Sequence, residues 1–436
     1  MAADTLAAQR VGSVTGLEDI AEALLQRLRE RGFEQTQVEA GEHSRCELNL
    51  AHNEPSLLRS NTSRKVAASA IVAGRRASAE ATDLTDEGLA RLVDEIWEAA
   101  QSAPQDEAHA VSSGQQLNLV RGPLQADPQA LAGALRTLLD WRAAHTPSMM
   151  IEEATAAHRR ERTLTLTTGG SRIDTDMGWV EMSVFGLARE GAQTSSFNYA
   201  GGTAEALSDV PHAFGLSRMM GELTRQVHTR PLGARFVGDV VLAPGAMADL
   251  VEWLFGQLDD GPLIDGSSLY RQKVGQAIAS PLLTLQSRYD APGCSPVTGD
   301  AFVAPAARLL DAGRLTQLTP SLYGSRKTGV PHTPWADGWE LLPGTTPLAE
   351  LIAAVPRGAL VDRLSMGEPA PNGDFSGVIK NSFALESGRV GDALAETMIS
   401  GNVARMLLEV AAVSAERIDS GSHALPWVRI GGLHFS

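Results

Sequence analysis

The sequence has few of the features that mark secreted or membrane proteins. Its 436 residues include two cysteines, Cys46 and Cys294, which lie far apart, so a disulfide framework is not expected and a reducing compartment fits. No run of about 18 apolar residues occurs, because charged residues such as Asp249 and Arg405 interrupt the longest candidates. The N-terminus has an early acidic residue and no apolar segment, which argues against a signal peptide. We therefore expect a cytoplasmic protein without a membrane partner.

Positive charge is also in short supply. The formal net charge is −15, whereas proteins that bind nucleic acid usually carry a basic patch that faces the phosphates. The composition therefore argues against a nucleic-acid partner.

The familiar catalytic and nucleotide-binding motifs are missing as well. There is no G-x-G-x-x-G, P-loop, G-x-S-x-G, S-x-x-K or His-Glu-x-x-His, and the ten histidines form no i, i+4 pair. Cys294 lies in a turn-rich loop, where an incidental cysteine is favoured over a nucleophile that would need a nearby base. Asp259 and Asp260 precede a glycine at a helix end, which favours a solvated turn over an acid–base pair.

The apolar patterning predicts an α+β fold in three regions. Residues 1–105 read as a helix, an antiparallel meander and a second helix. Residues 116–230 open with Asp127 and Pro128, which are typical of a helix start, and continue into alternating strands and a helix over about 213–228. The third region, 234–436, is expected to be mostly antiparallel β, barrel-like or sandwich-like, with an inserted pair of helices.

The inserted helices follow a short buried strand at residues 240–242. Apolar residues then recur at helical spacing from Met247 to Leu258, which predicts a helix over 246–258 with one buried face. A second helix is expected over roughly 267–279, ending before Pro281.

The positive signals near the C-terminus are long polar loops. A glycine-rich loop at 367–377 leads into a strand, Glu386 to Gly388 turns the chain, and residues 395–402 lead into a helix. Loops of this composition often line a site, although structural turns are an equal alternative.

These ordered motifs resemble the TldD/PmbA family, and within it the PmbA/TldE branch, over residues 238–436. The matching segments are Asp311–Leu315, Tyr323–Gly329, Asn372–Gly377, Glu386–Gly388 and Ile399–Asn402. TldD members of the family carry a zinc-binding His-Glu-x-x-x-His on the helix after the buried strand. Aligned from that strand without gaps, the hexapeptide falls on Glu252-Trp253-Leu254-Phe255-Gly256-Gln257.

The two histidines and the glutamate of the zinc motif are replaced here by Glu252, Gln257 and Trp253, which therefore occupy degenerate positions. Only the glycine that family members have within the motif is kept. TldD members also supply a cysteine ligand near the C-terminus, and the equivalent stretch here, residues 418–426, has none. Its His423 could bind zinc in principle, but a loop histidine is the favoured interpretation, since Glu252 and Gln257 would complete a poor site.

The resemblance implies the metal-free subunit of a cytosolic heterodimeric peptidase. In that hypothesis a TldD-type partner carries the zinc, and the pair degrades or processes unfolded or short peptides; a homodimer is the alternative when the partner is absent. Tyr323, Asn372 and Asp374 are the candidates for loops that face a substrate cavity between the subunits. The competing hypothesis is a self-sufficient hydrolase, or a peptide-binding protein, that reuses the fold without zinc.

Overall fold

The computed structural model describes residues 16–436, which divide into two compact units. The first unit comprises residues up to 43, 63–119 and 161–175, and the second comprises residues 44–62, 120–160 and 176–436. Long strands therefore contribute residues to both units. Each unit is described by itself below.

The first half of the chain alternates long strands with helices. In chain order its elements are α1 (Leu17–Arg31), β1 (Gln35–Ala51), β2 (Glu54–Val72), β3 (Arg75–Ala81), α2 (Asp86–Ser102), β4 (Gln116–Arg121), α3 (Pro128–His145), β5 (Met149–Thr167), β6 (Arg172–Glu190), β7 (Gln193–Thr194), β8 (Asn198–Ala204), the 3-10 helix η1 (Ala213–Gly215) and α4 (Leu216–Arg225). The strands form an eight-stranded sheet of order β3-β2-β1-β5-β6-β4, with β7 and β8 paired to β6.

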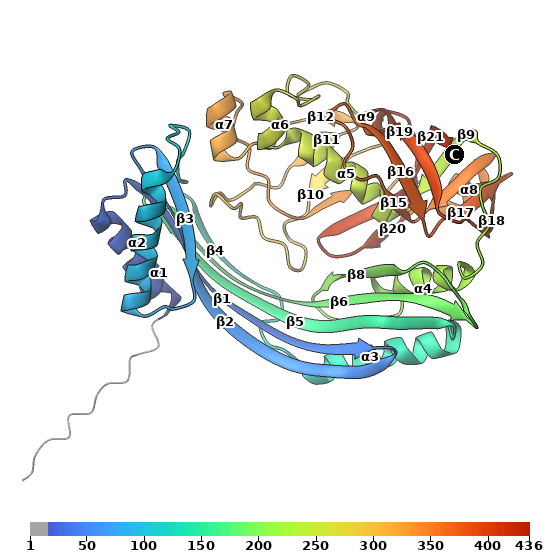
Figure 1. The fold of residues 1–436 in the computed structure, drawn as a ribbon, viewed down its shortest axis with the longest axis horizontal. Helices are drawn as coiled ribbons and strands as arrows, with labels where there is room; N and C mark the ends of the chain where they lie inside the picture. The colour runs from blue at the N-terminus through green and yellow to red at the C-terminus, as the bar shows by residue number, and fades with distance from the viewer. Residues whose placement is uncertain (1–15) are drawn as a thin grey trace, which may run out of the picture. The chain divides into compact units, whose positions relative to one another are not determined.

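In the first unit, α1 and α2 pack against each other and against the sheet (Figure 1). Their apolar stripes, including Leu24 and Leu28 of α1 and Leu92 and Ile96 of α2, are fully or almost fully buried. The strands pack small residues such as Ala68 against these helices. One face of the sheet is therefore buried, which accounts for the alternation of apolar and polar residues along the strands.

In the second unit, α3 begins where the sequence predicts. The Asp127 carboxylate accepts hydrogen bonds from the backbone N–H groups of Gln129 and Ala130, and Pro128 occupies the first helical turn. The α3 stripe packs with residues of β5 and β6 and with α4 in one core. This core supports β8, which pairs antiparallel with β6.

The second half of the chain is mostly strand. Its elements are β9 (Phe236–Leu242), α5 (Pro244–Leu258), α6 (Asp260–Asp265), β10 (Leu285–Ser287), β11 (Arg308–Asp311), β12 (Arg314–Leu315), α7 (Leu322–Thr328), β13 (Trp339–Leu341), α8 (Leu348–Ala353), β14 (Arg357–Val361), β15 (Arg363–Ser365), β16 (Asp374–Lys380), β17 (Phe383–Glu386), β18 (Arg389–Ala393), β19 (Thr397–Asn402), α9 (Val403–Leu408), β20 (Val410–Asp419) and β21 (His423–Phe435).

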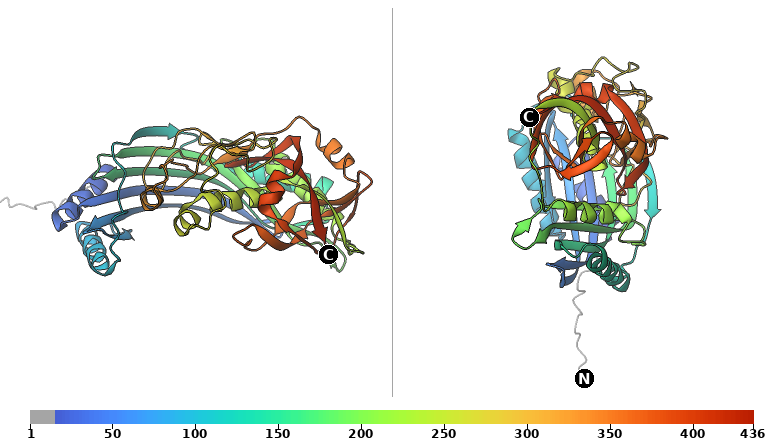
Figure 2. Two further views of the ribbon diagram at one scale, coloured as in Figure 1. Left: turned by 90° about the horizontal axis from the view of Figure 1, so that it is seen from above. Right: turned by 90° about the vertical axis from the view of Figure 1, so that its right-hand side faces the viewer.

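These strands form one branched thirteen-stranded sheet that curves around a common core (Figure 2). Its main path runs β12-β11-β10-β13-β21-β9-β14-β17-β18, and β21 also pairs with β19 and β20. The pairings are antiparallel except β9 with β14 and β13 with β21. The buried face of α5 fills the centre of this core, where Met247, Leu250 and Leu254 are completely buried.

The α+β prediction is confirmed, with a mostly antiparallel C-terminal region and an inserted helix. Over residues 16–436 no sheet closes into a barrel. In the same range, no helix combines the length and apolar character needed to cross a membrane.

The prediction of a second inserted helix over residues 267–279 is wrong. The chain forms the shorter helix α6 instead, which ends at Gly266 with a φ of 81°. Residues 267–279 follow as turns, in which Tyr270 and Ile278 reach the core although the backbone is irregular. Their apolar spacing mimics a helix because both face the same core.

Candidate functional site

The helix α5 presents two different faces to its surroundings. One face is core, and the opposite face carries Gly245, Asp249, Glu252, Gly256 and Asp259 at helical spacing, none of them buried. This second face borders two hollows, both of which lie wholly within the second unit.

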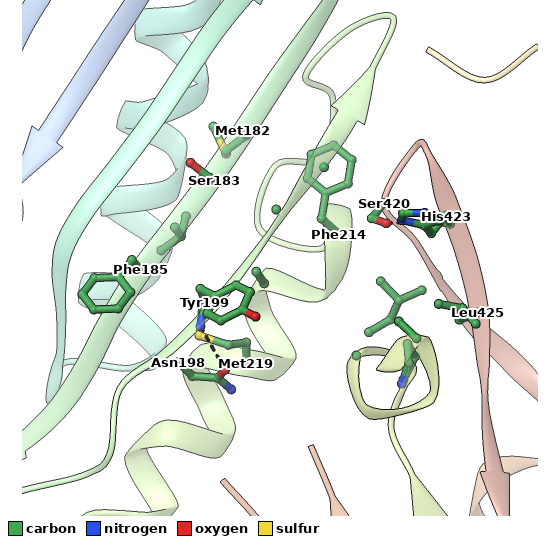
Figure 3. Close-up of a pocket in the computed structure, with 18 of the residues that line it drawn as sticks. Met182, Ser183, Phe185, Asn198, Tyr199, Phe214, Met219, Ser420, His423 and Leu425 are labelled. Atoms are coloured by element: carbon green, nitrogen blue, oxygen red, sulfur yellow. Dashed lines mark hydrogen bonds between the residues drawn. The ribbon is translucent and has the colours of Figure 1, made fainter. Parts of the chain in front are cut away.

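The first hollow, which we call the β8 hollow, has a volume of about 740 Å³. Its walls come from β6, β8, η1, α4, the start of α5, β15 and the turn between β20 and β21. Figure 3 labels ten of its residues, among which Tyr199 lies between Phe185 on β6 and His423 on β21. The wall is therefore assembled from segments that are far apart in the sequence.

The second hollow, which we call the Trp339 hollow, also has a volume of about 740 Å³. It lies along the second half of α5, against the loop that contains Cys294 and the segment 335–339. The two hollows share Arg159, Glu181, Thr203 and His423, so they are neighbours on one surface of the second unit.

At the three degenerate positions of the zinc motif on α5, the side chains are exposed or contact other parts of the protein. Glu252 is exposed, and Trp253 packs edge-on against Tyr270 with ring centroids 6.2 Å apart. Gln257 is buried, and its Oε1 accepts a hydrogen bond from the backbone N–H of Leu269 at 3.1 Å. The side chains thus serve packing and turn formation.

These residues do not fit a zinc ion. Zinc sites use three or four thiolate, imidazole or carboxylate ligands, whereas these positions offer one carboxylate, an indole and an amide already engaged with the backbone. Within residues 16–436, no three His, Cys, Asp or Glu side chains come together as a metal site. His423 lines both hollows, where its ring packs on Trp339 at 4.4 Å between centroids.

His423 and Cys294 both line the Trp339 hollow, and burial shifts the pKa of each in favour of its neutral form. Burial lowers the pKa of His423, an effect that Asp337 opposes and Arg288 reinforces, so the neutral imidazole is favoured. Burial also raises the pKa of the Cys294 thiol, against the effects of Arg121 and Arg288. A thiol with a raised pKa is a poor nucleophile, which agrees with an incidental loop cysteine.

Three of the four arginines that line the β8 hollow, Arg45, Arg159 and Arg218, are paired with carboxylates. Glu181 accepts from Arg45 at 3.1 Å and from Arg159 at 2.7 Å. Arg218 donates to Asp362 at 2.7 Å. Their charges are therefore largely neutralised inside the wall.

The pair formed by Arg218 and Asp362 belongs to a larger buried cluster. The second oxygen of Asp362 accepts from Asn198 at 2.6 Å, and Arg218 also donates to Glu222 at 2.5 Å. Burial and the nearby Asp362 raise the pKa of Glu222 to about 7, although Arg218 opposes the rise. The cluster links β8, α4 and the residue before β15, and Asn198, Arg218 and Asp362 also line the hollow.

The three predicted substrate residues lie elsewhere. Tyr323 is on α7, and its ring carries the Lys327 ammonium at 5.9 Å from the centroid. Asn372 and Asp374 form an exposed turn in which Asp374 accepts from Asn372 and from Asn402, each at 2.8 Å. None of the three lines either hollow. Their expected place is a cavity between subunits, so that role stays a prediction.

Of the residues that line the β8 hollow, the sequence motifs singled out His423 alone. Asp249 was visible only as an interruption of an apolar run, and no sequence pattern indicated Tyr199 or Asp362. The available signal was the position of Asp249 on the polar face of the helix that the zinc motif had singled out. Tyr199 and Asp362 carry no such local signal, because only the tertiary fold brings them together.

Comparisons with known proteins agree with the motifs. Residues 237–436 match the family model described as the PmbA/TldA metallopeptidase C-terminal domain. A search of curated proteins finds no match to the chain. Ten chains of solved structures match, and the three described below share the fold over nearly the full length of both chains.

The first of these is TldE from Thermococcus kodakarensis, with a TM-score of 0.81 and 18% identity over 96% of this chain and 100% of that one. The second, from Bacteroides thetaiotaomicron, is described as a candidate modulator of DNA gyrase and has a TM-score of 0.84 and 18% identity over 96% and 98%. The third, from Thermotoga maritima, has the same description, with a TM-score of 0.77 and 17% identity over 97% and 100%.

The family resemblance predicted from the sequence motifs is thereby confirmed for residues 237–436, which match the PmbA/TldA metallopeptidase C-terminal domain, and the chain shares the fold of TldE over 96% of its length. At this level of identity the structural matches establish the shared fold.

Proposed function

We propose that this chain is a TldE/PmbA-like, zinc-free subunit of a cytoplasmic heterodimeric metallopeptidase. A TldD-type partner supplies the zinc, and the pair degrades or processes unfolded or short peptides. The observation that carries the proposal is the engagement of Trp253 and Gln257 in packing and backbone hydrogen bonds, at the positions where zinc-bearing relatives have catalytic and ligand residues.

The edge of β8 supports a peptide as the substrate. On one side β8 pairs with β6, and within residues 16–436 no strand pairs with its other side. Thr203 donates its N–H from that other side to Ser420 at 3.0 Å. Because backbone groups alternate along a strand, Tyr199 and Gly201 direct theirs to the same edge, where the Tyr199 N–H donates to the Asn198 side chain at 2.9 Å. An extended peptide could add there as a strand, beside the β8 hollow.

Strand addition explains selectivity for unfolded chains. It needs several consecutive peptide N–H and C=O groups that are free to bond, and folded proteins have already used theirs. The proposed substrate class therefore follows from backbone chemistry and does not depend on a particular side chain.

The test is to purify the chain, a TldD-type homologue from the same organism, and a mixture of the two. Size-exclusion chromatography should give a mixed complex, and the mixture should cleave an unstructured peptide faster than either component. Failure of the complex to form, or full activity of the homologue alone, contradicts the proposal. Zinc-independent cleavage by the isolated chain would instead favour a self-sufficient hydrolase.

N-methylated peptides test the mode of binding. In an extended strand alternate N–H groups face the neighbouring strand, so methylation at every second residue should block binding in one register. The same number of methyl groups placed on consecutive residues near one end is the matched control. Equal binding of both peptides would rule out strand addition at β8.

A further inference from the structure

The β8 hollow contains one carboxylate whose charge is not matched by a close partner. Within residues 16–436, Asp249 makes no hydrogen bond and no ion pair, unlike the other charged residues that line the hollow. It lies in the second turn of α5 and is partly buried. A carboxylate that faces a cavity without a partner is suited to receive a positively charged group from a ligand.

The charged groups around Asp249 do not fill that role. Glu252, one turn further along α5, carries a like charge. Arg363 on β15 is the cation nearby, but its guanidinium stacks on Phe197 and Tyr199, 4.9 and 5.3 Å from their ring centroids, and bonds to the Phe197 carbonyl at 3.3 Å. Burial and Glu252 together raise the pKa of Asp249 to about 7, and Arg363 only partly offsets them.

The remaining wall of the hollow is rich in aromatic surface. Tyr199 is 63% exposed and Phe185 is 37% exposed, which is high for rings of this size. Phe214 borders the same space from a left-handed backbone conformation with a φ of 55°, which is costly for a bulky residue (Figure 3). Aromatic faces attract cations, and exposed aromatic clusters often mark binding sites.

We infer that the β8 hollow binds an alkylammonium group, with Asp249 as the charge partner and the rings of Phe185, Tyr199 and Phe214 as the surrounding wall. The group would come from the N-terminus of a peptide or from a lysine side chain. This inference rests on the proposed function, because it takes the ligand to be a peptide, and it adds a side-chain or terminus preference to backbone recognition.

The chemistry of the wall favours a cation over an anion. Glu181 and Asp362 already neutralise Arg45, Arg159 and Arg218, and the fourth arginine of the wall, Arg363, is held on the rings of Phe197 and Tyr199. An ammonium group that contacts Asp249 would also relieve its repulsion with Glu252. A volume of about 740 Å³ is large enough for a lysine side chain together with its neighbouring residues.

The inference is tested by calorimetric titration of the full chain with three short unstructured peptides. The first has a free N-terminus and no lysine, the second is N-acetylated with one lysine, and the third is N-acetylated without lysine. We expect the third to bind at least about tenfold more weakly than one of the other two. Which of the first two binds more tightly identifies the source of the ammonium group.

The variant Asp249→Asn keeps the shape of the side chain and removes its charge. It should reduce the affinity for the ammonium-bearing peptide about tenfold and leave the neutral peptide unchanged. Asp140→Asn, an exposed position on α3 outside both hollows, is the matched control and should bind like the unchanged protein.

The outcomes separate this inference from the proposed function. If all three peptides bind equally well, and bind equally to Asp249→Asn, the ammonium site is refuted while peptide binding stands. If none of the peptides binds, either to the chain or to its complex with a zinc-bearing partner, both the ammonium site and the peptide role are refuted.

Discussion

Replacing Asp249 by asparagine should stabilise the protein at alkaline pH. Burial and the like charge of Glu252 raise the pKa of Asp249 from its ordinary value of 3.8 to about 7 in the folded chain. Ionised Asp249 therefore opposes folding. The unchanged protein loses stability from this group as the pH rises from about 4 to about 7, and an asparagine does not.

The size of the effect follows from the two pKa values. A difference of about three pH units corresponds to about 4 kcal/mol in the absence of solvent screening, since each unit is worth about 1.4 kcal/mol. Asp249 is only partly buried, so we discount this to about 2 kcal/mol. More than half of that difference should develop between about pH 5 and about pH 8.5.

Urea unfolding of the unchanged protein, Asp249→Asn and Asp140→Asn at these two pH values measures the effect. Asp249→Asn should have the highest midpoint at about pH 8.5, and its advantage should shrink at about pH 5. The control Asp140→Asn should follow the unchanged protein at both. The assignment of Asp249 as a desolvated carboxylate would be refuted if Asp249→Asn had no higher urea midpoint than the unchanged protein at about pH 8.5. It would also be refuted if the difference in midpoint were the same at about pH 5 and about pH 8.5.

Three further substitutions probe the packing and the proposed role. Arg218→Met leaves Asp362 buried without its partner and should cost about 3–5 kcal/mol of unfolding free energy, measured by urea unfolding; a cost below about 1 kcal/mol would contradict the ion cluster. Gln257→Ala removes the acceptor for the Leu269 N–H and should cost about 1–3 kcal/mol in the same assay, with no change in zinc content. Asp374→Ala should slow peptide cleavage by the mixed complex while the thermal midpoint of the chain stays within a few degrees; unchanged cleavage would remove this residue from the substrate path.

The sequence predicted the elements whose signals are local. The apolar spacing from Met247 to Leu258 predicted α5, and the Asp127 cap predicted the start of α3, since both depend on neighbouring residues only. The helix expected over 267–279 failed because burial at helical spacing does not require a helix when turns bring the same residues to the core.

The site was less predictable for the same physical reason. The replacement of the zinc motif at Glu252, Trp253 and Gln257 was visible in the sequence, because the motif lies on one helix and has fixed spacing. The sequence did not show that Asp249 and an aromatic wall line the same hollow. Tyr199 lies about fifty residues earlier in the chain, and it reaches the hollow because β8 pairs with β6.

In the proposed function, this chain contributes no zinc to the peptidase that it forms with a TldD-type partner. Elemental analysis of the isolated chain and of the mixed complex with a TldD-type partner tests it most directly. The account predicts about one zinc per mixed complex and none per isolated chain, because the α5 positions offer a lone carboxylate, an indole and an engaged amide. About one zinc per isolated chain, lost on Glu252→Ala, would contradict it.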